Sequence, residues 1–329
     1  MSKKQNQPKR KNKARILVGV GAAAAVGTAA VLGAAKWAYD YAFKPRPERS
    51  RDPYKLIGKQ SELYKDEIFQ AIERLEQLPC EWVHITSDDG LKLAGRYYHQ
   101  EDGAPLVIFF HGYRSPTLRD FSGGFWIYRE QGYNILMVDQ RSHGESEGEA
   151  ITMGIRERYD CLKWVEYAIE RFGPEVRILL GGISMGATTV MMAAEYLQDC
   201  PNVKGILADC GYSTVEGAMK ETIRQMKLPE EPSWQLLKLG ARVYGGFDLD
   251  ETSALSSLKK SRLPIVLIHG DQDERVPYEM IDENASACAS DQVVTFRVPG
   301  AEHGMCFFLD REGYHDTVVT FINGLFAEE

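Results

Sequence analysis

A pentapeptide of the Gly-x-Ser-x-Gly type, residues 182–186, is the strongest indication of chemistry in the chain. It follows an aliphatic run, Val176 to Leu180, which predicts a strand buried on both faces. It precedes Ala187 to Leu197, which predicts a helix. A sharp turn between strand and helix holds a serine in strained geometry with its hydroxyl exposed, as a nucleophile requires. The alternative interpretation is a glycine-rich turn in which Ser184 only caps the helix.

Two later loops offer the partners that such a serine needs. The segment Ile265 to Pro277 is a buried strand followed by two carboxylates. Asp273 is the better placed of the two to orient an imidazole, whereas Asp271 is interpreted as the cap of the turn and as the reserve candidate. His303 stands in a glycine-flanked loop after the last predicted strand. The order Ser184, Asp273, His303 predicts a nucleophile, an acid and a base.

The loop after the strand Leu106 to Phe110 is predicted to complete the site. It reads His-Gly-Tyr, and the backbone N–H of Tyr113 would be aimed at a developing oxyanion. The N–H of Met185 would be the second donor. The alternative is a plain β-turn with His111 in a structural role.

The sequence does not indicate a metal or nucleotide cofactor. Residues 139–146 are interpreted as a structural turn beside the serine, and Asp139 with His143 lacks further ligands at a plausible spacing. The cysteines have neither metal spacing nor the density of a disulfide-rich protein.

The elements that position these residues alternate between strands and helices. Strands are predicted at Trp82–Thr86, Leu91–Tyr98, Leu106–Phe110, Ile135–Val138, Val176–Leu180, Val203–Ala208, Ile265–Ile268 and Val293–Val298. This pattern predicts an α/β protein with a mostly parallel eight-stranded sheet flanked by helices. An insert at about residues 213–260 carries two helical patterns, Val215–Met226 and Trp234–Tyr244.

Residues 80–326 resemble the α/β-hydrolase superfamily, and most closely its branch of serine aminopeptidase and monoacylglycerol lipase-like bacterial hydrolases. The motifs that carry the resemblance are His111-Gly112, Asp139 to Ser146 (with Ser142 in place of a glycine), Gly182 to Gly186, His269 to Pro277 and His303-Gly304. The resemblance implies that the insert is a small helical cap over the nucleophile. Five cap residues would line the acyl pocket or only attach the cap to the body: Met219, Met226, Trp234, Leu237 and Tyr244.

Charge separates the N-terminus from the rest of the 329-residue chain. Residues 1–59 carry a formal charge of +11 and residues 60–329 carry −19. The acidic body argues against nucleic-acid binding. We therefore interpret residues 1–15 as a basic tail, and residues 80–329 as the hydrolase domain.

Residues 16–35 contain no charge and would extend about 30 Å as a helix, enough to cross a bilayer. Four aromatic residues at 37, 39, 41 and 43 suggest an interfacial belt. A single-pass membrane anchor is predicted, with a cleaved signal peptide as the alternative. Residues 36–79 are predicted to be a linker and an amphipathic helix, Ser61–Leu78. Basic residues flank the span almost equally, and the long downstream domain is expected outside the cytoplasm.

The sequence therefore predicts a membrane-anchored serine hydrolase that cleaves a carboxylic ester through an acyl-enzyme. Its partners would be a small-molecule acyl substrate and the membrane, with no cofactor. A peptidase or amidase and an acyltransferase remain alternatives that use the same three residues. A non-catalytic binding protein on a hydrolase scaffold is a further alternative.

Overall fold

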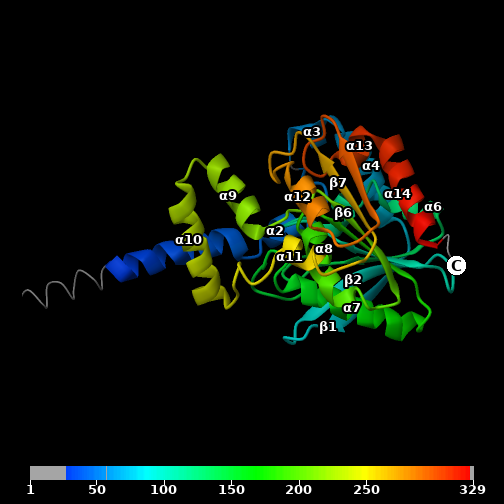
Figure 1. The fold of residues 1–329 in the computed structure, drawn as a ribbon, viewed down its shortest axis with the longest axis horizontal. Coiled ribbons are helices and arrows are strands. Elements are labelled where there is room, and N and C mark those ends of the chain that lie inside the picture. Colours follow the sequence, from blue (N-terminus) through cyan, green and yellow to red (C-terminus); the bar gives the residue numbers. More distant parts are fainter. Residues whose placement is uncertain (1–26, 57, 327–329) are drawn as a thin grey trace, which may run out of the picture.

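The computed structural model describes residues 27–56 and 58–326 and is built around one eight-stranded sheet (Figure 1). The strands are β1 (Glu81–Thr86), β2 (Lys92–Tyr98), β3 (Leu106–Phe110), β4 (Asn134–Val138), β5 (Ile178–Ile183), β6 (Val203–Asp209), β7 (Ile265–Gly270) and β8 (Val293–Val298). Their order in the sheet is β1-β2-β4-β3-β5-β6-β7-β8. Only the pairs β1–β2 and β2–β4 are antiparallel. The predicted mostly parallel sheet of eight strands is therefore confirmed.

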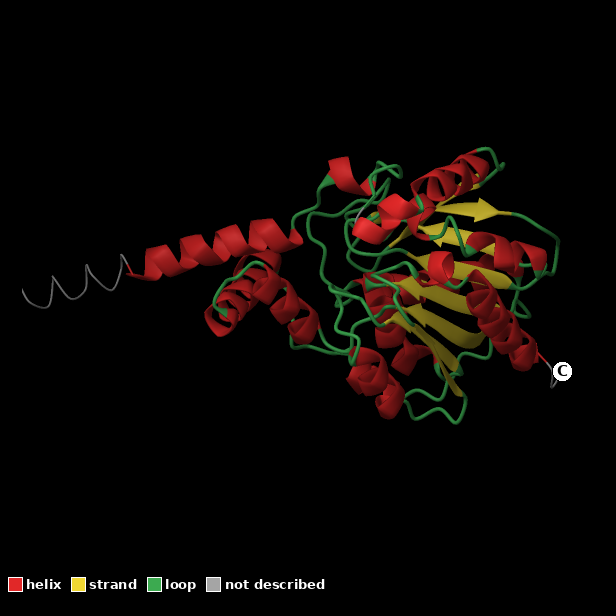
Figure 2. Ribbon diagram, turned by 90° about the horizontal axis from the view of Figure 1, so that it is seen from above, coloured by secondary structure: helices red, strands yellow, loops and turns green. Residues whose placement is uncertain are grey.

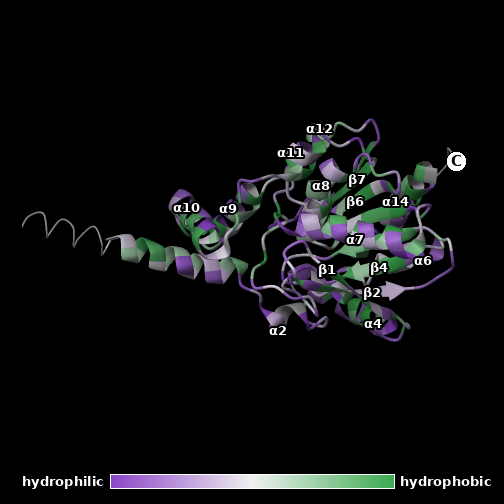
Figure 3. Ribbon diagram, turned by 90° about the horizontal axis from the view of Figure 1, so that it is seen from below, coloured by the Kyte–Doolittle hydropathy of each residue, from purple (hydrophilic) through white to green (hydrophobic). Residues whose placement is uncertain are grey.

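Both faces of the sheet are buried, as the continuous aliphatic runs require. In β3, Leu106, Ile108 and Phe110 enter one hydrophobic cluster, while Val107 and Phe109 enter the cluster on the opposite face. The central strands are correspondingly hydrophobic in Figure 3. Neighbouring side chains of one strand thus anchor two separate layers of helices.

The helices form these two layers and a protruding cap (Figure 2). They are α2 (Pro47–Ser50), α3 (Lys59–Leu63), α4 (Lys65–Glu76), α5 (Thr117–Asp120), α6 (Phe125–Glu130), α7 (Glu157–Phe172), α8 (Met185–Leu197), α9 (Val215–Gln225), α10 (Glu230–Gly240), η1 (Ala241–Gly245), α11 (Ala254–Leu258), α12 (Met280–Ala287), α13 (Cys306–Leu309) and α14 (Arg311–Phe326). Helices α7, α8, α11 and α12 contribute to the cluster on one face, and α4, α6 and α14 to the other.

Several element boundaries differ from the predicted ones. Strand β5 begins at Ile178 and continues through two glycines to Ile183, because β3 and β6 still pair with it there. The single helix predicted over Ser61–Leu78 is two helices, α3 and α4, separated at Tyr64. Leu63 is the last residue of the first helix and is 81% exposed, so the apolar face of the predicted single helix does not extend to it. Helix α10 begins at Glu230, four residues before the predicted start.

The N-terminal helix, residues 27–43, lies against the cap formed by α9, α10 and η1 (Figures 1 and 2). A Cβ atom on Gly240 would overlap the carbonyl oxygen of Ala35, so the two helices cross at backbone contact. The hydroxyl of Tyr244 donates to the carbonyl of Leu32 at 3.0 Å. Tyr39 and Phe43 are 4% and 0% exposed within the hydrophobic cluster under the cap.

The aromatic residues at positions 37, 39, 41 and 43 were predicted to form a membrane-interface belt, and this prediction is wrong for two of them. Tyr39 and Phe43 lie on the buried face of the helix, because an interval of four residues returns to the same face. Trp37 and Tyr41 lie on the outer face and remain 61% and 41% exposed. Residues 36–43 are thus packed on the body rather than acting as a linker.

The predicted anchor falls partly outside the described residues, which begin at residue 27. Within the described ranges, no helix combines the length and the apolar character that a membrane crossing needs. Leu32 and Ala35, which belong to the predicted anchor, contact the cap. Packing on the cap thus conflicts with a full span over residues 16–35.

Candidate active site

Ser184 occupies a sharp turn between β5 and α8, as predicted. Its backbone has φ 56° and ψ −117°, a conformation that costs energy in a non-glycine residue. A Cβ on Gly182 would overlap the backbone of Gly186, and a Cβ on Gly186 would overlap the carbonyl of Phe110. Both glycines are therefore required where strand and helix approach, and the serine hydroxyl is left at the carboxyl end of the sheet.

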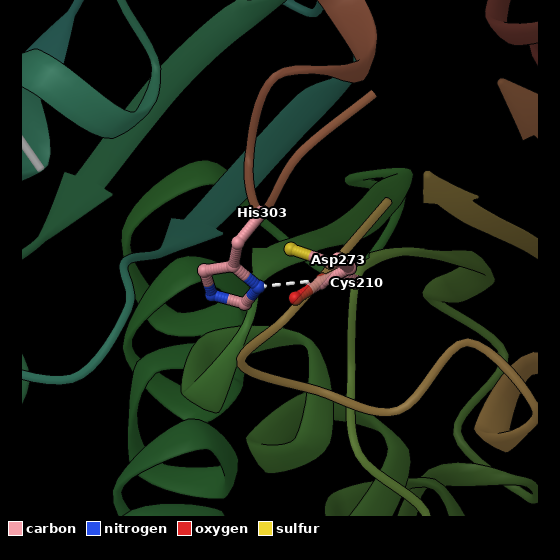
Figure 4. A group of neighbouring side chains, drawn as sticks. All are labelled: Cys210, Asp273 and His303. Atoms are coloured by element: carbon pink, nitrogen blue, oxygen red, sulfur yellow. Dashed lines mark hydrogen bonds and ion pairs between the residues drawn. The ribbon is translucent and has the colours of Figure 1, made fainter. Parts of the chain in front are cut away.

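The structure brings the three predicted side chains together. The hydroxyl of Ser184 donates to Nε2 of His303 at 2.9 Å. Nδ1 of His303 donates to a carboxylate oxygen of Asp273 at 2.7 Å, the bond drawn in Figure 4. With the proton on Nδ1 facing the carboxylate, the lone pair of Nε2 faces the serine hydroxyl. Such a tautomer is able to take a proton from the serine.

Asp273 is fixed as an ionised group. Its Oδ1 accepts from the backbone N–H groups of Arg275 and Val276, at 2.8 and 2.9 Å. Its Oδ2 lies 3.2 Å from Nε2 of His269, in addition to the bond from His303. Burial alone would raise the pKa of this carboxyl group, but the electrostatic interaction with His303 and the hydrogen bonds from both histidines lower it below its ordinary value.

Asp271, the reserve candidate, does not contact His303. Its Oδ1 accepts from the backbone N–H of Gly300 at 2.7 Å, so the carboxylate joins two loops. The interpretation of Asp271 as a capping residue agrees with this geometry. His269, by contrast, belongs to the quoted motif but was not predicted to touch the acid. The sign available in the sequence was its position directly after the predicted buried strand Ile265–Ile268.

The loop that begins at Gly112 lies against the serine. A Cβ on Gly112 would be 3.4 Å from the Cβ of Ser184, and the N–H of Gly112 donates to Asp120 at 2.7 Å. Tyr113, the predicted oxyanion donor, follows directly. Met185 is the first residue of α8, so its N–H has no acceptor within the helix and adjoins the serine. Asp120 was not predicted, because nothing in its local sequence distinguishes it from a surface acid.

Two buried histidines hold this loop in place. Nε2 of His111 accepts from the N–H of Gln140 at 3.0 Å, and Nε2 of His143 accepts from the N–H of Arg114 at 2.9 Å. Burial lowers the pKa of His111 and lowers that of His143 well below its ordinary value, so both rings remain neutral acceptors. The structural role weighed for His111 matches these contacts.

The turn at residues 139–146 has the structural character predicted from sequence. Asp139 accepts from the Thr117 hydroxyl at 2.6 Å and from the N–H of Glu145 at 3.0 Å. Ser142, which replaces the family glycine, has φ 65° and donates its hydroxyl to Ala150 at 2.9 Å. The side chain thus makes a local bond in a conformation that glycine adopts more readily.

One group of metal-capable side chains occurs in the described part of the chain: Cys210, Asp273 and His303 (Figure 4). Burial raises the pKa of the Cys210 thiol well above its ordinary value, so the sulfur keeps its proton. Nδ1 of His303 and Oδ2 of Asp273 are already bonded to each other. A metal would have to displace both the thiol proton and this hydrogen bond, so these residues are poorly suited to hold one.

A hydrophobic cluster adjoins the serine on the side of the cap. Met185 is fully buried in it, together with Met219, Trp234 and Leu237 from the cap. The other two predicted cap residues, Met226 and Tyr244, are 37% and 36% exposed because they lie at the ends of the cap helices.

Comparison with known proteins identifies the family. Residues 119–328 match the prolyl oligopeptidase family of peptidases. The chain belongs to this family. It is 24% identical to YqkD, an uncharacterised protein of Bacillus subtilis, over 79% of this chain and 83% of that protein. It is 21% identical to the bifunctional esterase/perhydrolase DCH of Acinetobacter calcoaceticus, over 68% of this chain and 93% of that enzyme.

This member of the prolyl oligopeptidase family is also similar in fold to a solved structure. The Pyrococcus furiosus esterase Pf2001 superposes with a TM-score of 0.60 at 25% identity, covering 76% of this chain and 94% of that esterase. The α/β-hydrolase fold expected from the sequence is therefore confirmed, and the chain is a member of a hydrolase family.

Proposed function

We propose that this protein is a serine hydrolase in which Ser184 is the nucleophile, His303 the general base and Asp273 the orienting acid. The observation that carries the proposal is the continuous hydrogen-bonded relay from the Ser184 hydroxyl through His303 to Asp273, at 2.9 and 2.7 Å. Its members come from three loops at the carboxyl ends of β5, β7 and β8. Esterases among the relatives lend independent support.

The geometry suits a two-step acyl transfer. Oγ of Ser184 attacks a carbonyl carbon while Nε2 of His303 removes its proton. Charge develops on the carbonyl oxygen, which the N–H groups of Tyr113 and Met185 would stabilise. His303 then gives the proton to the leaving group, and a water molecule repeats the sequence to release the acid.

A carboxylic ester with an apolar acyl group is the proposed substrate. Met185 is buried in a cluster of methionine, aromatic and aliphatic side chains under the cap. Such a lining favours hydrocarbon over a charged group, because burying an unpaired charge costs several kcal/mol or more. Hydrolysis of a peptide or amide is the second candidate, favoured by membership of a family of peptidases.

The test compares purified full-length wild type with Ser184→Ala on p-nitrophenyl esters of increasing chain length and on aminoacyl p-nitroanilides. We expect the wild type to hydrolyse the esters and the variant to lose this activity with its melting temperature unchanged. Faster turnover of the anilides would replace the esterase assignment by the peptidase one. Ester hydrolysis by Ser184→Ala at the wild-type rate would remove Ser184 from the mechanism.

We also propose that the N-terminal segment associates the enzyme with a membrane, with the catalytic domain outside the cytoplasm. Residues 16–31 are uncharged and follow a basic tail, which supports insertion into lipid. The full-length protein should stay in the membrane fraction through a carbonate wash, and protease added to intact cells should digest it. Release by carbonate, or full protection from protease, would contradict the attachment or the orientation respectively.

A further inference from the structure

The carboxyl end of the N-terminal helix meets the loop that carries Tyr113. The last carbonyl groups of a helix accept no hydrogen bond from within the helix, so they need donors from elsewhere. Here Nη2 of Arg114 donates to the carbonyls of Tyr41 and Lys44 at 2.8 and 2.7 Å. The hydroxyl of Tyr113 donates to the carbonyl of Ala42 at 2.6 Å. Two successive residues of the loop therefore hold the end of one helix.

The same helix end is held from a second side. The backbone N–H of Ile151 donates to the carbonyl of Phe43 at 2.8 Å. The ring of Phe43 is fully buried and packs edge-on against Phe247, at 5.3 Å between ring centres. These contacts make the helix end a fixed point, independent of the loop.

Arg114 is itself held in an unfavourable conformation. Its φ is 53°, in the left-handed region that a non-glycine residue adopts at a cost. Its N–H is bonded to His143, its guanidinium stacks on the Tyr113 ring at 4.7 Å, and its side chain is almost fully buried. A positive charge at a helix carboxyl end is also favourable. This many contacts on one strained residue indicate that the path of the loop is determined by its side chain.

We propose that Arg114 is a positioning residue: it fixes the oxyanion loop against the carboxyl end of the N-terminal helix. The loop is then held at two points. Asp120 binds the N–H of Gly112 on the side of the serine, and Arg114 binds the helix on the other side. The N–H of Tyr113 lies between these points. The inference rests on the proposed hydrolase function and on Tyr113 as an oxyanion donor.

Arg114→Gln in the full-length protein tests the proposal. Loss of a single oxyanion donor lowers kcat about 10²–10³-fold, and displacement of the loop should cause part of that loss. We expect kcat for a good ester to fall about 10–100-fold, with KM within about threefold. Arg114→Lys, which keeps the charge and donors, should recover part of the loss. The matched control is Arg156→Gln, because Arg156 also donates to a carbonyl at a helix end, but that carbonyl, of Gly246, belongs to the cap and not to the N-terminal helix.

A second readout separates positioning from general damage. The thiocarbonyl of a thionoester accepts hydrogen bonds poorly, so a functioning oxyanion site favours the oxygen ester. The rate ratio of ester to thionoester should therefore fall about tenfold in Arg114→Gln and stay unchanged in Arg156→Gln. Should Arg114→Gln fail to fold, Tyr113→Phe removes the hydrogen bond to the carbonyl of Ala42 and should lower the same rate ratio about threefold.

The outcomes distinguish this inference from the proposed function. If Ser184→Ala is inactive while the Arg114 and Tyr113 variants keep the wild-type kcat and rate ratio, the positioning role is wrong and the hydrolase assignment stands. An equal loss on both substrates, with no change in ratio, also overturns the positioning role. Activity in Ser184→Ala would contradict the proposed function itself.

Discussion

Replacing Asp273 by asparagine is the most informative single change, because the structure determines how the amide must lie. Oδ1 of Asp273 accepts two backbone N–H groups, those of Arg275 and Val276. Only the amide oxygen is able to take that place, so the amide nitrogen must occupy the position of Oδ2, facing Nδ1 of His303. Nδ1 then has to accept, and the proton moves to Nε2. His303 in that tautomer has no lone pair for the proton of Ser184.

The wrong tautomer should lower kcat for ester hydrolysis about 10⁴-fold, or about 5.5 kcal/mol in activation free energy. KM should change little, because Asp273 is buried and lies on the side of the His303 ring opposite to Ser184. The change is nearly isosteric, so the far-UV circular dichroism should match the wild type. Steady-state kinetics at neutral pH measure the effect.

The control is Asp271→Asn, which alters a carboxylate two residues away that, within the described ranges, binds the side chain of Gln272 and the N–H of Gly300. We expect its kcat within about threefold of wild type. A larger loss for Asp271→Asn than for Asp273→Asn would reverse the assignment of the acid. Retention of more than a tenth of the wild-type kcat by Asp273→Asn would refute the tautomer reasoning.

Two further predictions concern stability. Burial raises the pKa of Asp209 to about 6, so the folded state binds the proton of this carboxyl group more tightly than the unfolded state does. The free energy of unfolding of the wild type therefore falls as the pH rises from about 4 to about 6. Asp209→Asn should therefore gain up to about 3 kcal/mol over wild type in urea unfolding at pH 7.5 and much less at pH 4, whereas a gain independent of pH would contradict the burial argument. Gly186→Ala should cost about 3 kcal/mol or more, because its Cβ would overlap the Phe110 carbonyl. A Cβ on Gly324 in α14 meets nothing within 4 Å, so Gly324→Ala should stabilise the protein by up to about 1 kcal/mol. Thermal melts of the two alanine variants check this, and equal melting temperatures would be incompatible with it.

The sequence predicts the sheet and the three central side chains well, because both depend on local patterns. Buried strands read as short aliphatic runs, and Ser184 and His303 stand in glycine-flanked turns of restricted geometry. The choice of Asp273 over Asp271 also followed from the local sequence. These features require no knowledge of which distant segments meet.

The parts that the sequence did not predict depend on distant contacts. The aromatic residues near the N-terminus have the composition of a membrane belt, but Phe43 is instead buried by cap and body segments more than a hundred residues away. Arg114 and Asp120 carry no local signature, since their roles arise from the carbonyls and N–H groups they meet in the folded chain. Hydropathy reports how apolar a segment is and does not report what covers it.

Trapping the acyl-enzyme tests the central claim most directly. Full-length protein is mixed rapidly with an excess of a p-nitrophenyl ester, quenched in acid, digested and analysed by mass spectrometry. The account predicts a burst of p-nitrophenol equal to the enzyme present, with the acyl group on the peptide that contains Ser184 and none in Ser184→Ala. An acyl group on any other residue, or a burst that persists in Ser184→Ala, would contradict it.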